Sequence, residues 1–253
     1  MTTAILSALP EEQGGLMHAL QQPEQLQHAG RSFWRGHLHG QPVVLALSGI
    51  GKVAAATTAA ALAERFGVAR MVFTGVAGGV GEGVQVGDVV VAQDYLQHDF
   101  DASPIFPRWE VPGYGRARMD CDAALNALLL EAARAYLADA GAHFVAGLPN
   151  AARTPQVHHG LMASGDRFVS TAQESSALRA ALLASDHDVL AVEMEGAAVA
   201  QVCRDYGLPF AAVRTISDRA DDSAHVDFAH FVQNVASRYA DHIVQRFVQM
   251  LPK

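Results

Sequence analysis

Acidic residues stand where three expected strands end, and carboxylates in such places can act as general acids or bases. Glu11 and Glu12 follow a short apolar run near the start of the chain. Glu193 and Glu195 lie at the end of a second run, and Asp218 follows a third. Because ligands of α/β sheets bind beyond the carboxyl ends of the strands, we expect these side chains to surround one crevice.

Each carboxylate also has a simpler interpretation. Glu11, Glu12 and Glu195 could be charges that favour the positive end of a helix dipole, and Asp218 could cap a turn. Glu193 and Glu195, however, are two residues apart and would share one face of a strand end. Burying both without a polar task would be costly, so the coincidence of carboxylates favours a functional crevice.

A glycine-rich turn, Ser48–Lys52, joins an expected strand to an expected helix. The run from Gly49 to Ala54 satisfies the loose dinucleotide pattern, which also requires an acidic residue about 20 positions further on. The next strand ends with Phe73-Thr74-Gly75-Val76, which contains no carboxylate, so a dinucleotide-binding site is excluded. A phosphate-binding Walker loop is excluded too, since Val53 rather than Ser or Thr follows Lys52. A second glycine turn is expected at Gly75–Gly79.

Short β-branched runs alternate with alanine-rich helical patterns along the chain. We expect strands at Ala4–Leu9, Arg31–His37, Val43–Leu47, Met71–Thr74, Val89–His98, Gln156–Ser164, Val189–Glu193 and Pro209–Thr215. We expect helices at Glu11–Leu20, Lys52–Phe66, Cys121–Ala140, Ala172–Ala184, Gly196–Tyr206 and Phe228–Met250. The last two strands and the helix between them should form a βαβ unit. The pattern predicts one α/β domain over residues 1–253, a three-layer sandwich in which helices flank a central mixed sheet on both faces.

The composition narrows the possible partners. The chain has 253 residues, 50% of them hydrophobic, and a net charge of −8, which argues against nucleic-acid binding. Its two cysteines, Cys121 and Cys203, cannot form a disulfide framework and suit a reducing compartment, so we expect the cytoplasm. We expect no signal peptide and no membrane span. The 12 histidines are scattered, so we expect no metal site.

The segment Ala102–Arg118 combines prolines and aromatic residues and cannot be a regular element. Such a segment indicates a lid or a subunit contact. We therefore expect a homodimer in which one of its aromatic residues helps to close the neighbouring subunit's site: Phe106, Trp109 or Tyr114.

Five ordered segments carry a family resemblance: Ser48–Val53, Thr74–Gly79, Ser164–Phe168, Val192–Glu195 and Val213–Asp218. Together they resemble the nucleoside phosphorylase and nucleosidase superfamily, and the resemblance extends from Ala4 to about Val248. It implies that superfamily's three-layer α/β fold.

The resemblance also implies residue roles. Glu12 would hold the attacking water, and Asp218 would protonate the departing purine at N7. Met194 and Glu195 would bind the ribose. The positions implied for substrate binding are Leu9, Ile50, Val76, Phe168, Val169, Glu193, Met194, Glu195, Ser217 and Phe228. Among these, Phe168 would stack on adenine, the Val169 backbone would read its edge, and Leu9, Ile50 and Phe228 would line the 5′-thioalkyl pocket, while Phe106 and Tyr114 would reach the partner's site.

The implied reaction is hydrolysis of the N-glycosidic bond of 5′-methylthioadenosine or S-adenosylhomocysteine by water, without a cofactor. Cleavage puts positive charge on the sugar and negative charge on the base, so it needs a carboxylate near the ribose and a proton donor near the purine. Three alternatives remain: a phosphorylase, a nucleosidase for another nucleoside such as a futalosine-type compound, and a non-catalytic nucleoside-binding protein.

Departures from the superfamily pattern bear on these alternatives. Pro10 and Val76 replace a glutamate and a serine that are common in close nucleosidases, which affects substrate preference. Related phosphorylases carry arginines where this chain has Glu11-Glu12 and Phe73. Carboxylates repel phosphate but can orient and deprotonate water, so we expect water to be the nucleophile.

Overall fold

The computed structural model describes residues 1–145, 153–231 and 237–252. The strands are β1 (Thr3–Ser7), β2 (Gln21–His28), β3 (Arg31–Leu38), β4 (Gln41–Leu47), β5 (Arg70–Gly79), β6 (Val89–Gln97), β7 (Arg118–Asp120), β8 (Val157–Ser164), β9 (Val189–Glu193) and β10 (Phe210–Asp218). The helices are α1 (Pro10–Ala19), α2 (Lys52–Phe66), α3 (Ala123–Val145), α4 (Ala172–Leu183), α5 (Gly196–Tyr206), α6 (Ala224–Phe231) and α7 (Ser237–Met250). No helix within these ranges is long and apolar enough to cross a bilayer.

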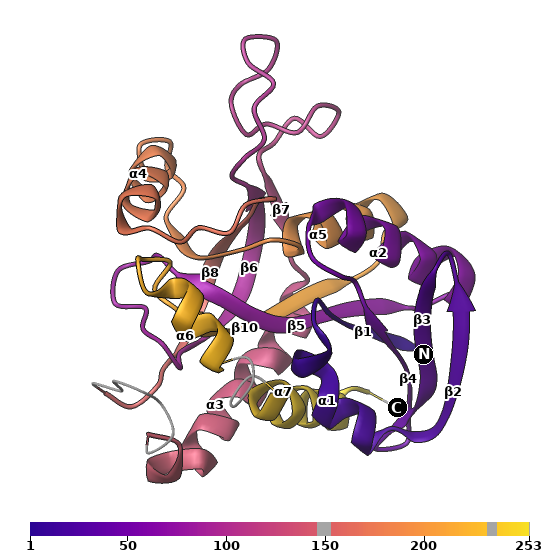
Figure 1. Cartoon of the computed structure of the whole chain (residues 1–253). Coiled ribbons are helices and arrows are strands. Elements are labelled where there is room, and N and C mark those ends of the chain that lie inside the picture. The colour runs from indigo at the N-terminus through magenta and orange to yellow at the C-terminus, as the bar shows by residue number, and fades with distance from the viewer. Residues whose placement is uncertain (146–152, 232–236, 253) are drawn as a thin grey trace.

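A mixed sheet runs through the molecule (Figure 1). At its centre, β5 pairs in parallel with β1 and β10, and its last two residues pair antiparallel with β9. Because β10 also pairs with β6, β6 with β8, and β8 with β9, the strands β5, β10, β6, β8 and β9 close into a ring. From β5 the sheet continues outward through β1 and β4 to the hairpin of β3 and β2.

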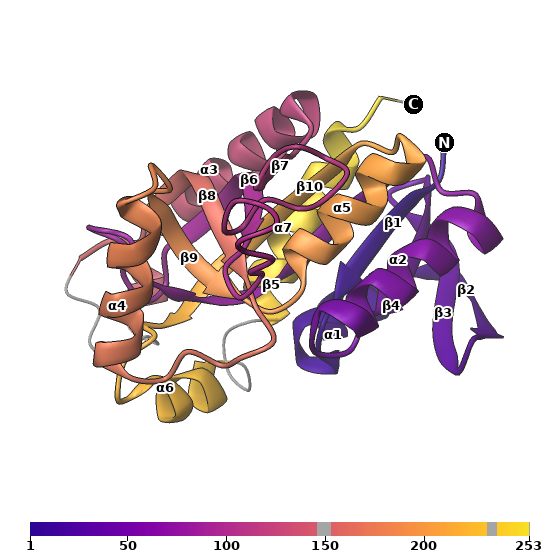
Figure 2. The same cartoon turned by 90° about the horizontal axis from the view of Figure 1, so that it is seen from above.

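Helices cover the sheet on both faces, as predicted (Figure 2). On one face α2 and α5 pack through small side chains such as Ala59 and Ala198, which let the helices approach the strands closely. On the other face α1, α3 and α7 contribute Leu16, Leu129 and Phe247 to a second core. The strands between these layers are apolar and buried; every residue of β10 is buried. The predicted three-layer α/β sandwich with a central mixed sheet is confirmed.

Three local predictions are wrong. The glycine run Gly75–Gly79 is not a turn: β5 continues through it, because its backbone pairs with β10 and β9. β9 and β10 do not form a βαβ unit of neighbouring parallel strands, because β5 lies between them and runs antiparallel to β9. The region predicted as one helix from Phe228 to Met250 contains α6 and α7, and residues 232–236 lie outside the described part.

Candidate active site

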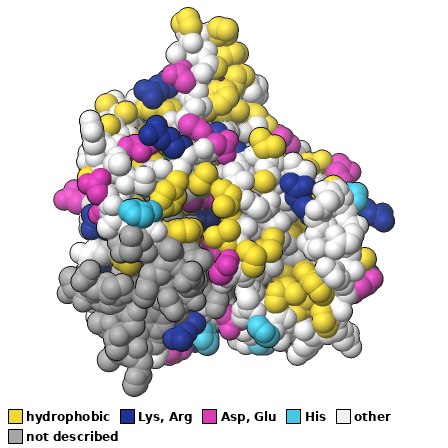
Figure 3. Space-filling view, viewed as in Figure 1, with side chains coloured by type: hydrophobic (Ala, Val, Ile, Leu, Met, Phe, Trp, Pro, Cys, Tyr) yellow, Lys and Arg dark blue, Asp and Glu magenta, His cyan; other side chains and the backbone are white. Residues whose placement is uncertain are grey.

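A cavity of about 350 Å³ lies at the ends of β1, β5, β9 and β10. This volume lies in the range of small-molecule sites, about 300–1,000 Å³. Figure 3 shows hydrophobic side chains gathered around a hollow on this face. The cavity is lined by every residue that the sequence assigned to catalysis or substrate binding: Leu9, Glu12, Ile50, Val76, Phe168, Val169, Glu193, Met194, Glu195, Ser217, Asp218 and Phe228. The chain therefore brings these dispersed positions to one place.

Glu12 lies on the first turn of α1 and is 3% exposed. Its Oε2 accepts hydrogen bonds from the N–H groups of Ala8, at 2.8 Å, and Leu9, at 2.9 Å. Its Oε1 accepts one from Val76 N–H at 3.0 Å. Burial raises the pKa of Glu12, although the charge of Arg214 and these hydrogen bonds oppose the rise. A carboxylate with a raised pKa on the cavity wall is suited to accept a proton from water.

Glu193 ends β9, and Glu195 directly precedes α5. Both carboxylates are buried, but their partners differ. Glu193 accepts hydrogen bonds from Gly196 N–H, at 2.8 Å to Oε2, and from the Ser164 hydroxyl, and it pairs with Arg214 at 2.5 Å. These contacts use both of its oxygens, so Glu193 anchors the turn into α5.

Within the described residues, the carboxylate of Glu195 accepts one hydrogen bond, from Gly51 N–H to Oε1 at 2.8 Å. Its other oxygen has no hydrogen-bond partner among the residues that the structure describes. Burial raises the pKa of Glu195 to about 8, and the nearby charge of Glu193 adds to the rise. Gly51 can approach because its φ of +95° is open only to a glycine-like backbone. Glu195 therefore presents a carboxyl oxygen that a ligand hydroxyl could use.

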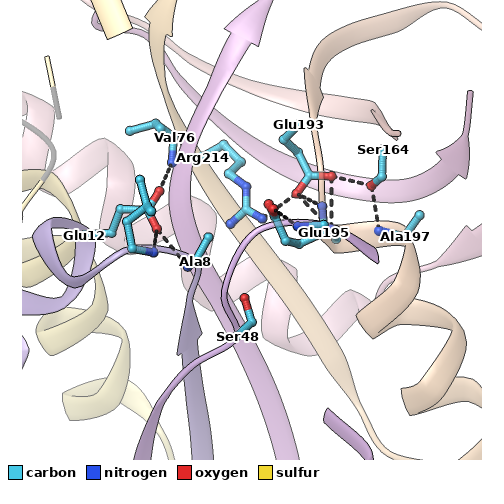
Figure 4. A network of polar contacts seen from close by, with 12 residues as sticks. Ala8, Glu12, Ser48, Val76, Ser164, Glu193, Glu195, Ala197 and Arg214 are labelled. Atoms are coloured by element: carbon cyan, nitrogen blue, oxygen red, sulfur yellow. Dashed lines mark hydrogen bonds and ion pairs between the residues drawn. The ribbon is translucent and has the colours of Figure 1, made fainter. Parts of the chain in front are cut away.

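Arg214 is a site residue that the sequence analysis missed. It lies on β10, is 1% exposed, and stands between Glu12 and the pair Glu193 and Glu195 (Figure 4). Its guanidinium lies 4.0 Å from the centre of the Phe73 ring, and its Nε and Nη1 have no partner within the described chain. Burial alone would lower its pKa, but Tyr95 and the surrounding carboxylates raise it, so the cation is permanent. The available signal was a charged residue inside the apolar run Phe210–Thr215.

A β-bulge places Ser217 and Asp218 side by side at the cavity. Ile216 pairs with Ala77 and Asp218 with Gly78, so Ser217 is an extra residue in β10. Regular alternation would send two consecutive side chains to opposite faces, whereas here both line the cavity. The Ser217 hydroxyl donates to Asp218 Oδ2 at 2.8 Å, and Ala220 N–H donates to Oδ1 at 2.8 Å. The Asp218 carboxylate is thereby held in one orientation.

Aromatic and aliphatic side chains form the rest of the wall. Phe168, in the loop between β8 and α4, is 40% exposed and meets Phe228 of α6 edge to face, with ring centres 5.6 Å apart. Val169 is buried beside Phe168. Ile50, from the loop before α2, is 58% exposed at the rim. Such a wall suits a flat aromatic ring and an apolar substituent.

The segment from Ala102 to Arg118 is irregular, as predicted, and rises above the end of the sheet (Figure 1). Its residues Phe106 and Tyr114 do not line this chain's cavity. Trp109 is 3% exposed and donates its indole N–H to His98 O at 3.1 Å, so it is not free to contact a partner subunit. The Tyr114 hydroxyl bonds to Asp205 of α5, and the most exposed hydrophobic side chain here is Ile105, at 82%.

Two further features distinguish this cavity from the rest of the described chain. A depression of about 610 Å³ beside α1, between Trp34 and Ser48, is larger than the cavity but is lined by no carboxylate. The described residues hold no group of three His, Cys, Asp or Glu side chains suited to a metal ion. The smaller cavity is therefore the candidate active site, because it alone of the two combines buried titratable groups with apolar walls.

Comparisons with known proteins agree with this site. Residues 2–249 match the family described as Phosphorylase superfamily. The chain is 34% identical to the 5′-methylthioadenosine/S-adenosylhomocysteine nucleosidase of Oceanobacillus iheyensis, over 96% of this chain and 97% of that protein. It is 35% identical to the nucleosidase of the same name from Anoxybacillus flavithermus, over 100% of both chains.

Solved structures give the same picture. The 5′-methylthioadenosine/S-adenosylhomocysteine nucleosidase from Neisseria meningitidis, in complex with methylthio-immucillin-A, superposes with a TM-score of 0.86 at 33% identity, covering 99% of both chains. A futalosine hydrolase mutant of Helicobacter pylori gives a TM-score of 0.84 at 30% identity, covering 99% of this chain and 100% of the other. With matches along nearly its whole length, this chain belongs to the phosphorylase superfamily, in the same family as these nucleosidases.

Proposed function

We propose that this chain hydrolyses the N-glycosidic bond of 5′-methylthioadenosine and S-adenosylhomocysteine, releasing adenine and the thioribose. One observation carries the proposal: Glu12, Glu195 and the Ser217–Asp218 pair face the same cavity, and most of its other lining residues are apolar. That arrangement can supply a base for water, an acceptor for ribose hydroxyls and a proton donor for the base. The names of the relatives support the same substrates.

In the proposed reaction, water adds to C1′ while the bond from C1′ to purine N9 breaks. Glu12 accepts a proton from the water, and Asp218, oriented by Ser217, delivers a proton to purine N7. Positive charge that develops on the ribose lies near Glu12 and Glu195, and Glu195 favours it electrostatically when it has lost its proton. Phe168 stacks on adenine, the Val169 backbone reads its edge, and Met194 packs on the ribose. Leu9, Ile50 and Phe228 enclose the 5′-thioalkyl group.

Water rather than phosphate is the proposed nucleophile. Arg214, the guanidinium among the carboxylates, is paired with Glu193 at 2.5 Å and flanked by Glu12 and Glu195. Arg167, which lines the cavity, is paired with Glu174 at 2.8 Å. A phosphate dianion placed there would meet a guanidinium whose charge Glu193 already balances, so it would gain little attraction at short range. Val76 supplies a backbone N–H to Glu12 but no hydroxyl for an anion.

The deciding experiment incubates purified protein with 5′-methylthioadenosine, S-adenosylhomocysteine, inosine and a futalosine-type nucleoside, with and without phosphate. We expect the two thioadenosine nucleosides to be cleaved fastest, with free 5-methylthioribose or S-ribosylhomocysteine as the sugar product and no dependence on phosphate. A ribose 1-phosphate product would identify a phosphorylase. Faster cleavage of the futalosine-type nucleoside would favour the alternative that the Helicobacter pylori neighbour represents.

We further propose that the chain works as a cytoplasmic homodimer in methionine salvage. Cys121 and Cys203 support a reducing compartment, since both are free cysteines. Ile105 on the projecting segment supports a dimer, because an exposed apolar side chain on such a segment is suited to an interface. Phe106 is partly buried beside it and remains the proposed contact with the partner's site.

A further inference from the structure

Three charged residues outside the cavity connect the loops that form two of its walls. Lys52 begins α2, Asp99 follows β6, and Asp166 lies between β8 and α4. None of them lines the cavity. We propose that Lys52, Asp99 and Asp166 form a positioning clamp that fixes the base-binding loop, residues 167–169, relative to the carboxylate of Glu195. The inference deepens the proposed function and rests on it.

The three residues are joined in a closed cycle. The Lys52 ammonium pairs with Asp99 Oδ1 at 2.5 Å. The other oxygen of that carboxylate, Oδ2, accepts a hydrogen bond from Asp166 N–H at 2.8 Å. The Asp166 carboxylate returns to the start, since its Oδ1 accepts from Lys52 N–H at 2.7 Å. Both oxygens of Asp99 are therefore used, one for each loop.

The cycle reaches the active site through the neighbours of its members. Gly51, next to Lys52, donates its N–H to Glu195 Oε1 at 2.8 Å. Asp166 directly precedes Arg167, Phe168 and Val169, all of which line the cavity. A shift of Asp166 relative to Lys52 would thus change the separation between the proposed adenine site and the proposed ribose site. Misplacement of a substrate by about 1 Å can cost about a hundredfold in rate.

The ion pair of the clamp is partly buried, unlike an ordinary surface ion pair. The side chains of Lys52 and Asp99 are 15% and 31% exposed, and Lys52 Nζ also donates to Gln97 Oε1 at 3.1 Å. Burial would raise the pKa of Asp99, but the hydrogen bonds from Lys52 and Asp166 outweigh it and lower the pKa. Phe168 is 40% exposed, so its own packing does little to fix its ring. The clamp supplies the constraint that packing does not.

Asp99→Asn is the sharpest variant, because it keeps the side-chain shape. An amide has one acceptor oxygen, so either Lys52 or Asp166 N–H loses its hydrogen bond to residue 99. We expect the KM for 5′-methylthioadenosine and the inhibition constant of adenine to rise about tenfold, as the loss of one charge-assisted hydrogen bond implies, with a smaller effect on kcat. Lys52→Met should act in the same way, and Lys52→Arg should restore most of the loss.

The control is Asp139→Asn, which breaks an exposed pair with Arg246 at 2.7 Å on another part of the surface. It should leave KM, kcat and adenine inhibition unchanged. A second readout is base selectivity: the ratio of kcat/KM for 5′-methylthioadenosine over 5′-methylthioinosine should fall in Asp99→Asn. Loss of folded protein alone would not change that ratio.

Two results would overturn the clamp. One is unchanged KM and adenine inhibition in both Asp99→Asn and Lys52→Met. The other is a loss that follows the folded fraction, measured by circular dichroism, without restoration by Lys52→Arg. A wild-type protein that cleaves no nucleoside would instead contradict the proposed function. Calorimetric titration with adenine would then test the clamp by itself, with weaker binding expected in Asp99→Asn.

Discussion

The carboxylate of Glu12 lies so close to Gly75 that a Cβ carbon on residue 75 would stand 2.6 Å from Glu12 Oε1. The contact joins the first turn of α1 to the middle of β5. The N–H of the next residue, Val76, donates to the same oxygen at 3.0 Å. The place of the proposed catalytic base is thus set by a neighbour that has no side chain.

Gly75→Ala should abolish activity without unfolding the protein. The added methyl group forces the Glu12 carboxylate away from the proposed water position, and loss of general-base catalysis costs roughly 10²–10⁴-fold in kcat. Steady-state kinetics and circular dichroism would measure the two effects. The control is Gly14→Ala in α1, where nothing lies within 4 Å of the new methyl group. That variant should stay active and gain about 0.5–1 kcal/mol of stability. Full activity in Gly75→Ala would show that catalysis does not depend on the position of the Glu12 carboxylate.

Asp218→Asn should reduce kcat by about 10²-fold or more, because the amide keeps the shape but cannot supply the proton. Ser217→Ala should cost less, about tenfold, since it removes only the hydroxyl that orients Asp218 at 2.8 Å. Both variants should unfold at temperatures near that of the wild type. If Asp218→Asn keeps more than about a tenth of the wild-type kcat, Asp218 is not the general acid.

The bulge at Ser217 marks a limit of sequence analysis. The sequence places Ser217 and Asp218 at the end of β10, but strand alternation alone would separate their side chains. Only the pairing of β10 with β5 brings both to the cavity, and that pairing depends on residues about 140 positions apart, as in the contact from Ser217 to Ala77 O. The same long-range closure kept Gly75–Gly79 in a strand where its composition indicates a turn.

Sequence analysis predicted the helix bounds correctly where a neighbouring residue alone ends the helix. The bounds of α2 and α5 match the predictions, because Gly67 and Gly207 end these helices in the left-handed conformation, with φ of +54° and +64°. β2 was missed because it is polar and exposed at the edge of the sheet and contains Pro23, so no apolar alternation distinguishes it from a loop. Within the described sheet β2 pairs with β3 alone, and these pairing hydrogen bonds, not an apolar pattern, define it as a strand.

Ile105→Asp should weaken the proposed dimer. The side chain is 82% exposed on the projecting segment, and a carboxylate placed in an apolar interface would be costly to bury. Sedimentation should give a dimer for the wild type at micromolar concentration and a larger monomer fraction for the variant, with a lower kcat/KM at the same protein concentration. Leu183→Asp, on an exposed part of α4, is the matched control and should change neither. A monomeric wild type would contradict the dimer.

Glu195 should make the stability of the free protein depend on pH. Burial raises its pKa from the ordinary value of 4.5 to about 8, so the folded chain holds this proton more tightly than the unfolded chain does. Below pH 4.5 the carboxyl group is protonated in both the folded and the unfolded chain, so its titration does not change the free energy of unfolding there. Between pH 4.5 and about 8, unfolding releases the proton, and the free energy of unfolding therefore falls as the pH rises.

Comparison of the wild type with Glu195→Gln isolates this effect, since the amide does not titrate. The variant should gain stability relative to the wild type as the pH rises through this window, by at most about 1.4 kcal/mol per pH unit. Urea denaturation at several pH values would measure the difference. Glu24→Gln, which breaks an exposed pair with Arg35, should run parallel to the wild type. If Glu195→Gln does so too, Glu195 is already ionised in the free protein.

The same carboxylate should also make substrate binding depend on pH. An ionised carboxylate accepts hydrogen bonds from hydroxyl groups more strongly, so the KM for 5′-methylthioadenosine should fall as Glu195 loses its proton. Glu195→Gln should remove that dependence.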